Sequence, residues 1–315
     1  MNRIIVLGGA GFLGLHLCEL LKDNGLDVAV VDDCSRGRNQ TSGVEYIRAD
    51  VTRAGILEDI LTPDDHVVNL AATVAGVIYN QAHNAEMFHS NLDVQAVPLA
   101  VAYKVGVERF LQVSSACIYA PGYTDPCVEE NGMLGEPVQA NNGYAWAKRM
   151  GERLVGWYVE QGLNAGIVRP SNLFGPHDYF DEKAHVIPAM IRRCFEDSEL
   201  VFNGTGEEVR EFLYVEDAAA GIYEVLRKGR RGEAYNLGTN GFTRISMQDL
   251  AVMVRDLCGM WAKPITFMPK HDAGDTVRWS DSGKIYRDTG WQHSTPLQVG
   301  LGYTIEWYKG AYDVA

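Results

Sequence analysis

The sequence has few basic residues for its size. Its 315 residues include 28 lysines and arginines against 41 aspartates and glutamates, a formal net charge of −13. Proteins that bind the phosphate backbone of nucleic acids need clustered Lys and Arg, so this balance argues against a nucleic-acid partner. It does not exclude a small anionic ligand, because a helix N-terminus and a few arginines can hold such a group locally.

Paired cysteines and metal-binding spacings are also missing. The six cysteines include no CxxC pair, and none stands at zinc-finger spacing from a histidine. We therefore expect free thiols, a reducing compartment and no bound metal ion.

Long apolar runs and repeats are absent as well. The four apolar residues after Arg3 are too few for the core of a signal peptide, and no stretch is long enough to span a bilayer. With 46% hydrophobic and 22% charged residues, the composition is that of an ordinary globular protein. We expect a soluble, cytoplasmic protein without a membrane partner.

The first half of the chain shows a repeated strand–helix pattern. Buried strands are predicted where apolar residues run continuously, at residues 4–7, 28–32, 66–70, 108–114 and 165–169. Helical spacing of apolar residues separates them, at residues 12–22, 54–61, 86–105 and 144–160. This order predicts an α/β fold with a doubly wound parallel sheet of the Rossmann type.

The pattern loosens after about Pro170, where Pro and Gly become frequent. Shorter helices are predicted at residues 186–195, 215–227 and 247–257, mixed with isolated strands. We interpret this part as a smaller α/β domain that closes over the carboxyl edge of the sheet. Ligands bind at that edge in open α/β folds.

A glycine-rich loop follows the first predicted strand and opens a helix. Gly9, Gly11 and Gly14 satisfy the GxGxxG pattern. Such glycines let the backbone approach a pyrophosphate, and the helix N-terminus supplies N–H groups and a partial positive charge. A tight turn without a ligand is the alternative. The residues expected to contact a dinucleotide here are Gly8, Gly11, Phe12, Leu13 and Gly14.

An acidic residue stands where a dinucleotide site requires one. Asp32 ends the second predicted strand, where its carboxylate can accept hydrogen bonds from the adenosine ribose hydroxyls. A carboxylate repels a 2′-phosphate, so Asp32 and Asp33 favour NAD over NADP. Arg36 and Arg38 follow closely and soften that preference.

Further cofactor contacts are expected at the ends of other strands. Asp50 and Val51 are either adenine contacts or an ordinary strand end, and the pattern leaves both interpretations open. The remaining expected contacts are Leu70, Ala71, Ala72, Tyr144, Lys148 and Pro170.

Tyr144 and Lys148 are four residues apart on a predicted helix, so their side chains share one face. The Lys ammonium and the positive nicotinamide ring both favour phenolate, which lowers the pKa of the Tyr. The phenol then transfers a proton while hydride moves to or from the cofactor. Ser115, after the fifth strand, is a natural hydrogen-bond partner for the same substrate oxygen.

Taken together, these segments resemble the extended short-chain dehydrogenase/reductase family of nucleotide-sugar enzymes, the NAD-dependent epimerase/dehydratases, over essentially the whole chain. Besides the glycine loop and the Tyr–Lys pair, the resemblance rests on Asn-Leu-Ala-Ala at 69–72, Ser-Ser-Ala-Cys-Ile-Tyr at 114–119, Arg-Pro-Ser-Asn-Leu-Phe-Gly-Pro at 169–176 and Arg-Glu-Phe-Leu-Tyr-Val-Glu-Asp at 210–217.

The resemblance implies a domain organisation and partners. Residues 1–175 would form the NAD-binding Rossmann domain, with returning segments near 211–240, and residues 176–315 would mainly bind the nucleotide sugar. It also implies a homodimer built on two paired long helices. Residues implied to contact the substrate are Asn172, Val186, Arg193, Arg210 and Arg278.

Two regions narrow the resemblance to enzymes that invert sugar carbons. Where 4,6-dehydratases of the family carry Asp-Glu, this chain has Ala116 and Cys117. The segment 177–188 resembles that of GDP-L-fucose synthases, which implies Cys117 and His185 as the acid–base pair. Its Glu-Lys-Ala run also resembles GDP-mannose 3,5-epimerases, which implies Lys183 instead. His177 would take the part of His185 if the loop were shifted.

The chemistry agrees with such a pair. A ketone at C4 acidifies the hydrogens at C3 and C5, and one group must remove a proton while another returns it on the opposite face. A thiol suits one role, and a histidine or a desolvated lysine suits the other. The alternative for Cys117 is a small buried apolar side chain.

The cofactor distinguishes the two groups of enzymes that the segment 177–188 resembles. A redox-neutral epimerase oxidises C4 with bound NAD and reduces it again, whereas a GDP-4-keto-6-deoxyhexose 3,5-epimerase/4-reductase consumes NADPH. Asp32 and Asp33 favour the NAD-dependent nucleotide-sugar epimerase, and the reductase is the alternative. The resemblance implies a GDP-sugar as substrate. A dinucleotide-binding sensor without turnover is disfavoured, because Tyr144 and Lys148 are both present.

Overall fold

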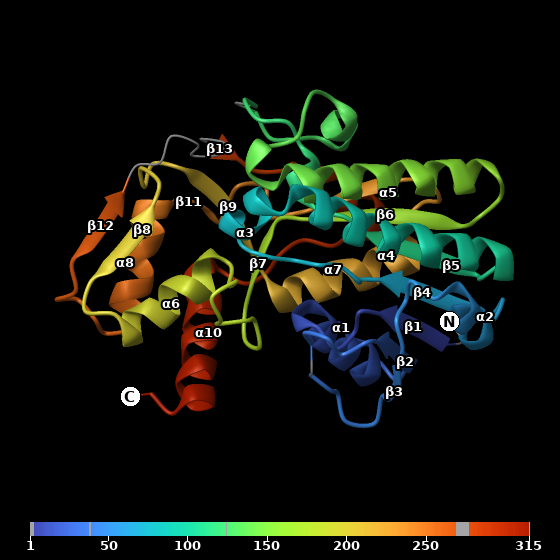
Figure 1. Cartoon of the computed structure of the whole chain (residues 1–315), viewed down its shortest axis with the longest axis horizontal. Helices are drawn as coiled ribbons and strands as arrows, with labels where there is room; N and C mark the ends of the chain where they lie inside the picture. Colours follow the sequence, from blue (N-terminus) through green and yellow to red (C-terminus); the bar gives the residue numbers. More distant parts are fainter. Residues whose placement is uncertain (1–2, 38, 124, 269–276, 315) are drawn as a thin grey trace.

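A parallel sheet of seven strands forms the centre of the computed structural model, which describes residues 3–37, 39–123, 125–268 and 277–314 (Figure 1). Its strand order is β10-β6-β5-β4-β1-β2-β3. Six of these strands follow the doubly wound order 3-2-1-4-5-6, which confirms the expected fold class. The strands are β1 (Arg3–Leu7), β2 (Asp27–Asp32), β3 (Glu45–Arg48), β4 (Asp65–Asn69), β5 (Arg109–Val113), β6 (Ala165–Pro170) and β10 (Ala234–Leu237).

Helices cover both faces of this sheet. On one face lie α2 (Ala54–Ile60), α4 (Asn84–Val105) and α5 (Asn142–Glu160), and on the other lie α1 (Phe12–Asp23) and α7 (Val215–Lys228) (Figure 1). In β1, Ile4 and Val6 pack toward α1 and α7, whereas Ile5 and Leu7 pack toward α2 and α4. Burial on both sides explains why these strands are continuously apolar.

The other strands of the second half of the chain, apart from β6 and β10, lie with α6, α8 and α10 at one end of the sheet (Figure 1). There β9 pairs with β7, β11 and β13, and β8 pairs with β12. A separate apolar core holds these strands to three helices and includes Phe174, Phe180, Leu250 and Tyr308. The elements are β7 (Asn172–Phe174), β8 (Leu200–Asn203), β9 (Val209–Tyr214), β11 (Arg244–Ser246), β12 (Ile265–Met268), β13 (Val277–Arg278), α6 (Val186–Glu196), α8 (Met247–Leu257) and α10 (Leu297–Tyr312).

Short elements complete the fold and were not expected from the sequence. They are α3 (Val77–Ala82), α9 (Gly283–Thr289) and the 3-10 turns η1 (Ala116–Ile118), η2 (Glu129–Met133) and η3 (Gln139–Asn141). Helix α10 and the β8–β12 pair were not expected either. None of the helices in the described ranges has the length and apolar character that crossing a bilayer requires.

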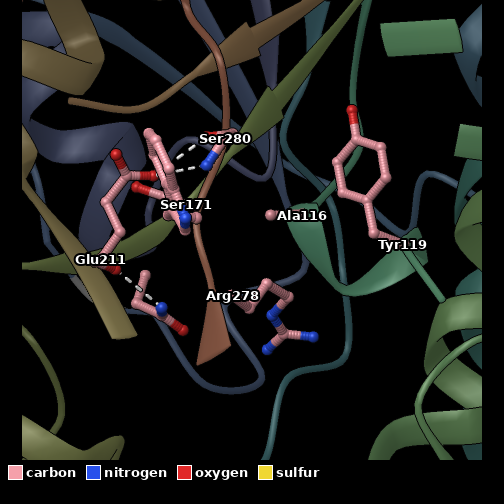
Figure 2. Close-up of a pocket in the computed structure, with 8 residues that line it drawn as sticks. Ala116, Tyr119, Ser171, Glu211, Arg278 and Ser280 are labelled. Carbon is pink, nitrogen blue, oxygen red and sulfur yellow. Dashed lines mark hydrogen bonds between the residues drawn. The ribbon is translucent and has the colours of Figure 1, made fainter. Parts of the chain in front are cut away.

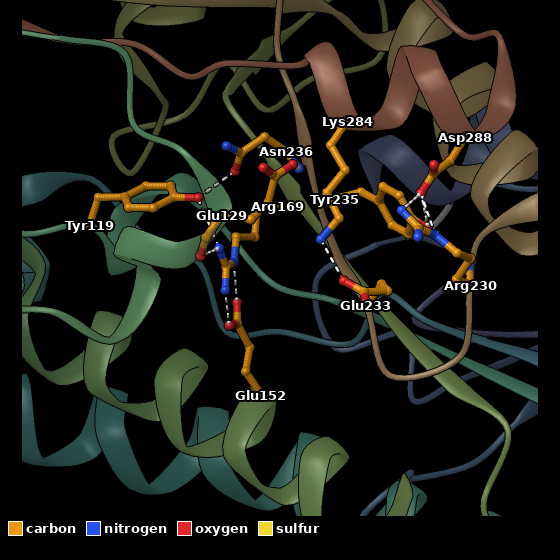
Figure 3. Close-up of polar contacts among 10 residues, drawn as sticks. All are labelled: Tyr119, Glu129, Glu152, Arg169, Arg230, Glu233, Tyr235, Asn236, Lys284 and Asp288. Carbon is orange, nitrogen blue, oxygen red and sulfur yellow. Dashed lines mark hydrogen bonds and ion pairs between the residues drawn. The ribbon is translucent and has the colours of Figure 1, made fainter.

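A buried ion pair joins the sheet to α5 (Figure 3). Arg169, at the end of β6, donates from Nε to Oε1 of Glu152 at 2.9 Å and from Nη2 to Oε2 at 2.7 Å. Its Nη1 donates to the Tyr119 hydroxyl at 2.9 Å and to the Glu129 carbonyl at 2.7 Å. The Tyr119 hydroxyl in turn donates to Oδ1 of Asn236 on β10 at 2.5 Å. One guanidinium therefore ties α5, the segment after η1 and the sheet together.

We predict that Arg169→Met strongly destabilises the protein. The substitution leaves the Glu152 carboxylate buried without its partner, which costs on the order of 3–5 kcal/mol. The measurement is the midpoint of urea unfolding. Adding Glu152→Leu should recover much of the loss, because the unpaired buried charge is then gone.

Arg230→Met is the matched control. The Arg230–Asp288 pair is similarly close, at 2.6 Å, but its arginine side chain is 62% exposed (Figure 3). Water screens such a pair, so the unfolding midpoint should barely move. Equal midpoints for the two single variants would refute a structural role for the buried pair.

Candidate active site

The glycine loop between β1 and α1 is shaped by close backbone contacts. Gly8 has φ +78°, and a Cβ there would lie 2.7 Å from the Ala71 nitrogen. A Cβ on Gly14 would lie 2.5 Å from Cα of Gly9, so the helix can approach the turn only without side chains. At Gly11, by contrast, a Cβ would meet only the Gly8 carbonyl at 3.4 Å and the Tyr179 hydroxyl at 3.9 Å. The backbone of Gly11 is therefore accessible to a ligand.

The N-terminus of α1 suits an anion. Its N-cap residue, Gly11, supplies no capping side chain, and the first turn carries no acidic residue. The first N–H groups of a helix, here those of Phe12 and Leu13, have no partner inside the helix and lie at the positive end of its dipole. Together with the bare glycine loop, these groups fit the pyrophosphate of a dinucleotide.

Asp32 lies at the end of β2 beside this loop. Its Oδ2 accepts from the Ala10 N–H at 3.0 Å, and its Oδ1 accepts from the Cys34 N–H at 2.8 Å. Burial raises the pKa of Asp32, and these two N–H groups partly offset that effect. Each carboxylate oxygen keeps a further lone pair for a ribose hydroxyl. Asp32 therefore also braces the glycine loop, a role that the motif alone does not reveal. The next residue, Asp33, accepts from the Ser35 N–H at 2.9 Å.

Arg36 makes contacts that its expected role did not include. Its guanidinium carbon lies 4.3 Å from the ring centre of Tyr179, and the group pairs with Asp181 at 3.6 Å. It also donates to the Val74 carbonyl. The arginine thus joins three loops instead of standing unpaired beside Asp32. Arg38 lies outside the described residues.

The other expected cofactor residues also follow the carboxyl ends of strands. Asp50, after β3, accepts from the Thr52 hydroxyl at 2.7 Å and the Thr52 N–H at 2.9 Å, and these hydrogen bonds lower the pKa of Asp50. Val51 is buried beside it. At the ends of β4 and β6 stand Leu70, Ala71, Ala72 and Pro170.

Ser115, Cys117, Tyr144 and Lys148 lie together. Ser115 Oγ accepts from the Cys117 N–H at 3.1 Å and hydrogen-bonds to the Tyr144 hydroxyl. Lys148 Nζ lies 5.6 Å from the ring centre of Tyr144 and donates to the Val113 carbonyl at 3.0 Å. The Asn141 amide donates to Cys117 Sγ at 3.8 Å. Turn η1 and helix α5 thus bring a thiol and a phenol into one cluster.

The pKa of Tyr144 differs from the sequence-based expectation. Burial raises it, the charge of a Cys117 thiolate would raise it further, and the Ser115 hydrogen bond only partly opposes this. Burial also lowers the pKa of Lys148 to about 8, against the opposing charge of Glu152. The protein's own groups therefore do not lower the pKa of Tyr144.

The loop before α6 carries both candidate partners of Cys117. His185, the N-cap residue of α6, has its Nδ1 3.7 Å from Oδ2 of the buried Asp178. Burial alone would lower the pKa of His185, but the Asp178 carboxylate outweighs it and raises the pKa. Lys183 is exposed, with Nζ 4.5 Å from the ring centre of Tyr79. Val186 opens α6 and is partly exposed. Of the two candidates, His185 is the one with a buried carboxylate partner.

A small cavity lies between η1, β7 and β13 (Figure 2). Its volume is about 10 Å³, and its lining includes Ser171, Asn172, Arg278 and Trp279. Arg278 lies next to Arg210 in register between β13 and β9. Arginines at neighbouring register positions are a combination that suits a diphosphate. Arg193 does not line this cavity: it donates to the Val201 carbonyl and lies 5.5 Å from the ring centre of Phe202.

A buried carboxylate, Glu211, organises this cavity and was not singled out from the sequence. Its oxygens accept from the N–H groups of Thr239 at 2.7 Å and Gly241 at 3.0 Å and from the Ser280 hydroxyl at 3.0 Å. A buried acidic residue directly before the apolar residues Phe212 and Leu213 of a strand is the signal that could have identified it. Asp178 and Asn141, the partners of His185 and Cys117, were missed for lack of any motif.

Comparison with known proteins identifies the family. The model of the NAD dependent epimerase/dehydratase family matches residues 4–238. The chain belongs to this family. A GDP-L-fucose synthase of Sinorhizobium fredii is 31% identical to it over 315 residues, which cover 97% of this chain and 95% of that protein. As a member of the family, the protein is an enzyme of the extended short-chain dehydrogenase/reductase type.

Solved structures of other family members have the same fold. The UDP-glucose 4-epimerase of Thermotoga maritima has a TM-score of 0.90 and 26% identity, covering 98% of this chain and 99% of that one. The dTDP-glucose 4,6-dehydratase DesIV of Streptomyces venezuelae, solved with NAD bound, has a TM-score of 0.88 and 25% identity, covering 99% and 98%. These relatives catalyse different reactions on sugars linked to different nucleotides. Family membership alone therefore determines neither the reaction nor the nucleotide of this protein.

We predict that Asp178→Asn lowers the pKa of His185. Removing the carboxylate takes away the negative charge that favours the protonated imidazole. An NMR titration of the imidazole, assigned with His185→Gln, measures the change. Because the folded-state pKa is raised, the pair stabilises the wild type fully below the ordinary value of about 6.5. That stabilisation is lost as the pH rises through the raised value. An unchanged titration in Asp178→Asn would contradict the pairing.

Proposed function

We propose that the protein is an NAD-dependent nucleotide-sugar epimerase that oxidises C4 transiently and inverts C3, C5 or both. The observation that carries this proposal is the position of Cys117. Its backbone N–H and its thiol belong to the cluster that contains Ser115, Tyr144 and Lys148. A group able to exchange carbon-bound protons therefore lies beside the residues suited to redox chemistry at C4.

The C4 step assigns distinct tasks to the cluster. Bound NAD would supply hydride acceptance at C4 and later hydride return. Tyr144 takes the proton of the C4 hydroxyl and gives it back, while Ser115 holds the same oxygen by a hydrogen bond. Lys148, held by the Val113 carbonyl, places a positive charge near the phenol and favours its ionised form.

The inversion step uses the acidity that the C4 ketone creates. One group removes the proton from C3 or C5, and a second group delivers a proton to the opposite face. We assign these tasks to Cys117 and His185. The buried Asp178 supports His185 in this assignment, because it stabilises the imidazolium that forms when His185 takes a proton. Lys183, which lies on Tyr79, is the alternative partner.

The cofactor assignment rests on the end of β2. The Asp32 carboxylate, next to the glycine loop, favours the free ribose hydroxyls of NAD and repels a 2′-phosphate. The alternative function is an NADPH-dependent GDP-4-keto-6-deoxyhexose 3,5-epimerase/4-reductase. The observation that favours it is the 31% identity to a GDP-L-fucose synthase across almost the whole chain.

The proposals for the substrate and for the oligomeric state are drawn from the same relatives. We propose a GDP-sugar, with its diphosphate at the Arg210–Arg278 pair. We also propose a homodimer through the paired helices α4 and α5. On these helices, Trp157 is 51% exposed and Tyr103 is 39% exposed. Trp and Tyr are enriched in protein–protein interfaces, so their exposure here supports a contact with a second copy.

We predict that the purified protein incorporates solvent deuterium at C3 or C5 of a GDP-hexose. Proton removal and return at those carbons exchange the hydrogen with solvent, and NMR or mass spectrometry of the sugar measures it. Cys117→Ser should reduce the exchange at least about a hundredfold, the usual contribution of a general acid–base group. Tyr144→Phe should also abolish it, because without the C4 ketone the carbon acid does not form.

Two further variants identify the partner of Cys117. His185→Gln should suppress exchange, whereas Lys183→Met should leave most of it. The opposite pattern would assign Lys183. Full exchange in Cys117→Ser would refute the assignment of that thiol, and turnover without any exchange would favour a simple C4 reaction.

We predict that denaturing the purified protein releases about one NAD(H) per chain. An enzyme that oxidises and reduces the same carbon retains its cofactor through the cycle. Liquid chromatography of the released nucleotides measures the stoichiometry and distinguishes NAD from NADP. A chain that releases no dinucleotide but oxidises added NADPH with a GDP-4-keto sugar would instead support the reductase.

A further inference from the structure

Tyr179 reaches the cofactor loop from the second half of the chain. It belongs to the loop between β7 and α6, yet its hydroxyl lies 3.9 Å from the position that a Cβ of Gly11 would occupy. The Asp32 carboxylate is also close enough to contribute to the raised pKa of Tyr179. Within the described residues, this hydroxyl makes no hydrogen bond to protein. A phenol donor thus stands beside Cα of Gly11, at the N-terminus of α1, where an anion fits.

The residues on either side of Tyr179 hold it in this place. His177 has φ +65°, and its ring lies 4.7 Å from that of Trp307 on α10 and 5.9 Å from that of His16 on α1. Phe180 is buried in the second core, 4.7 Å from the ring of Tyr308. The loop is therefore anchored on both sides of Tyr179, and the Tyr179 ring is presented at little entropic cost.

Arg36, from the first half of the chain, contacts the same loop as Tyr179. It follows β2, and its guanidinium covers the Tyr179 ring at 4.3 Å while pairing with Asp181 at 3.6 Å. Its bond to the Val74 carbonyl adds the loop after β4. These contacts join segments more than 140 residues apart in the sequence and direct the arginine toward Tyr179.

We propose that Tyr179 and Arg36 form a clasp that holds the dinucleotide by its pyrophosphate. The Tyr179 hydroxyl donates a hydrogen bond to a phosphate oxygen, and Arg36 fixes the ring and adds positive charge. A hydrogen bond to an ionised group is among the stronger ones in proteins. This inference rests on the dinucleotide binding in the proposed function. It makes cofactor retention depend on the same loop that carries His185.

The test is the affinity of the nucleotide-free full-length protein for NAD, ADP and adenosine, measured by calorimetry. Tyr179→Phe keeps the ring on Arg36 and removes only the hydroxyl. It should weaken NAD and ADP about tenfold, the effect of losing one charge-assisted hydrogen bond, and leave adenosine unchanged. The matched control is Tyr286→Phe, on the exposed Tyr286 of α9, which should bind all three ligands like the wild type.

Arg36→Met is the second variant. It should weaken NAD and ADP at least as much as Tyr179→Phe, and adding Tyr179→Phe to it should cause little further loss, because the two side chains act as a unit. Circular dichroism and the unfolding midpoint verify that each variant folds.

The outcomes separate this inference from the proposed function. If wild-type protein binds NAD and Tyr179→Phe binds NAD and ADP equally well, the clasp is refuted and the function stands. If adenosine weakens as much as ADP, the contact is not with the pyrophosphate and the inference also fails. If wild-type protein binds no dinucleotide, the proposed function fails.

Discussion

The bidentate pair between Arg169 and Glu152 is the constraint on which the active-site geometry depends. Glu152 lies one helical turn after Lys148 on α5, so fixing its carboxylate fixes the helix that carries Tyr144 and Lys148. The same guanidinium holds the hydroxyl of Tyr119, which follows the turn that carries Cys117. Proton transfer tolerates little displacement. A single buried cation therefore links the helix that carries the phenol to the segment that follows the turn with the thiol.

The two regions proposed to bind anions in this acidic protein are built in different ways. At the glycine loop, positive potential comes mainly from the backbone N–H groups at the start of α1. At the proposed diphosphate site, it comes from Arg210 and Arg278, which are register neighbours on β9 and β13, while Glu211 accepts hydrogen bonds from the N–H groups of Thr239 and Gly241. The formal net charge of −13 is thus compatible with negatively charged ligands, because both regions act over a few ångströms.

Features fixed by local sequence were predictable, and those fixed by distant contacts were not. Continuous apolar runs predicted β1, β2 and β6, and glycine spacing predicted the loop before α1. Helix α10 was not predicted because it contains Gly300, Gly302 and Gly310, and glycine disfavours helices. Gly300 is nevertheless suited to its place, since a Cβ there would lie 2.9 Å from the Phe174 ring. The contacts of Arg36 with Tyr179 and of His185 with Asp178 depend on how loops fold back, and no short motif encodes them.

Strand β10 has a consequence for how such a chain can be recombined. It comes after β7, β8, β9 and α7 in the sequence, yet it hydrogen-bonds to β6 as the last strand of the central sheet. A fragment ending near Gly175 would expose the backbone of β6 as an open edge, the kind of surface on which chains aggregate. The residues after Gly175 therefore cannot be exchanged as one C-terminal unit. Recombination between relatives would have to keep β10 with the sheet it completes and graft only the segments on either side of it.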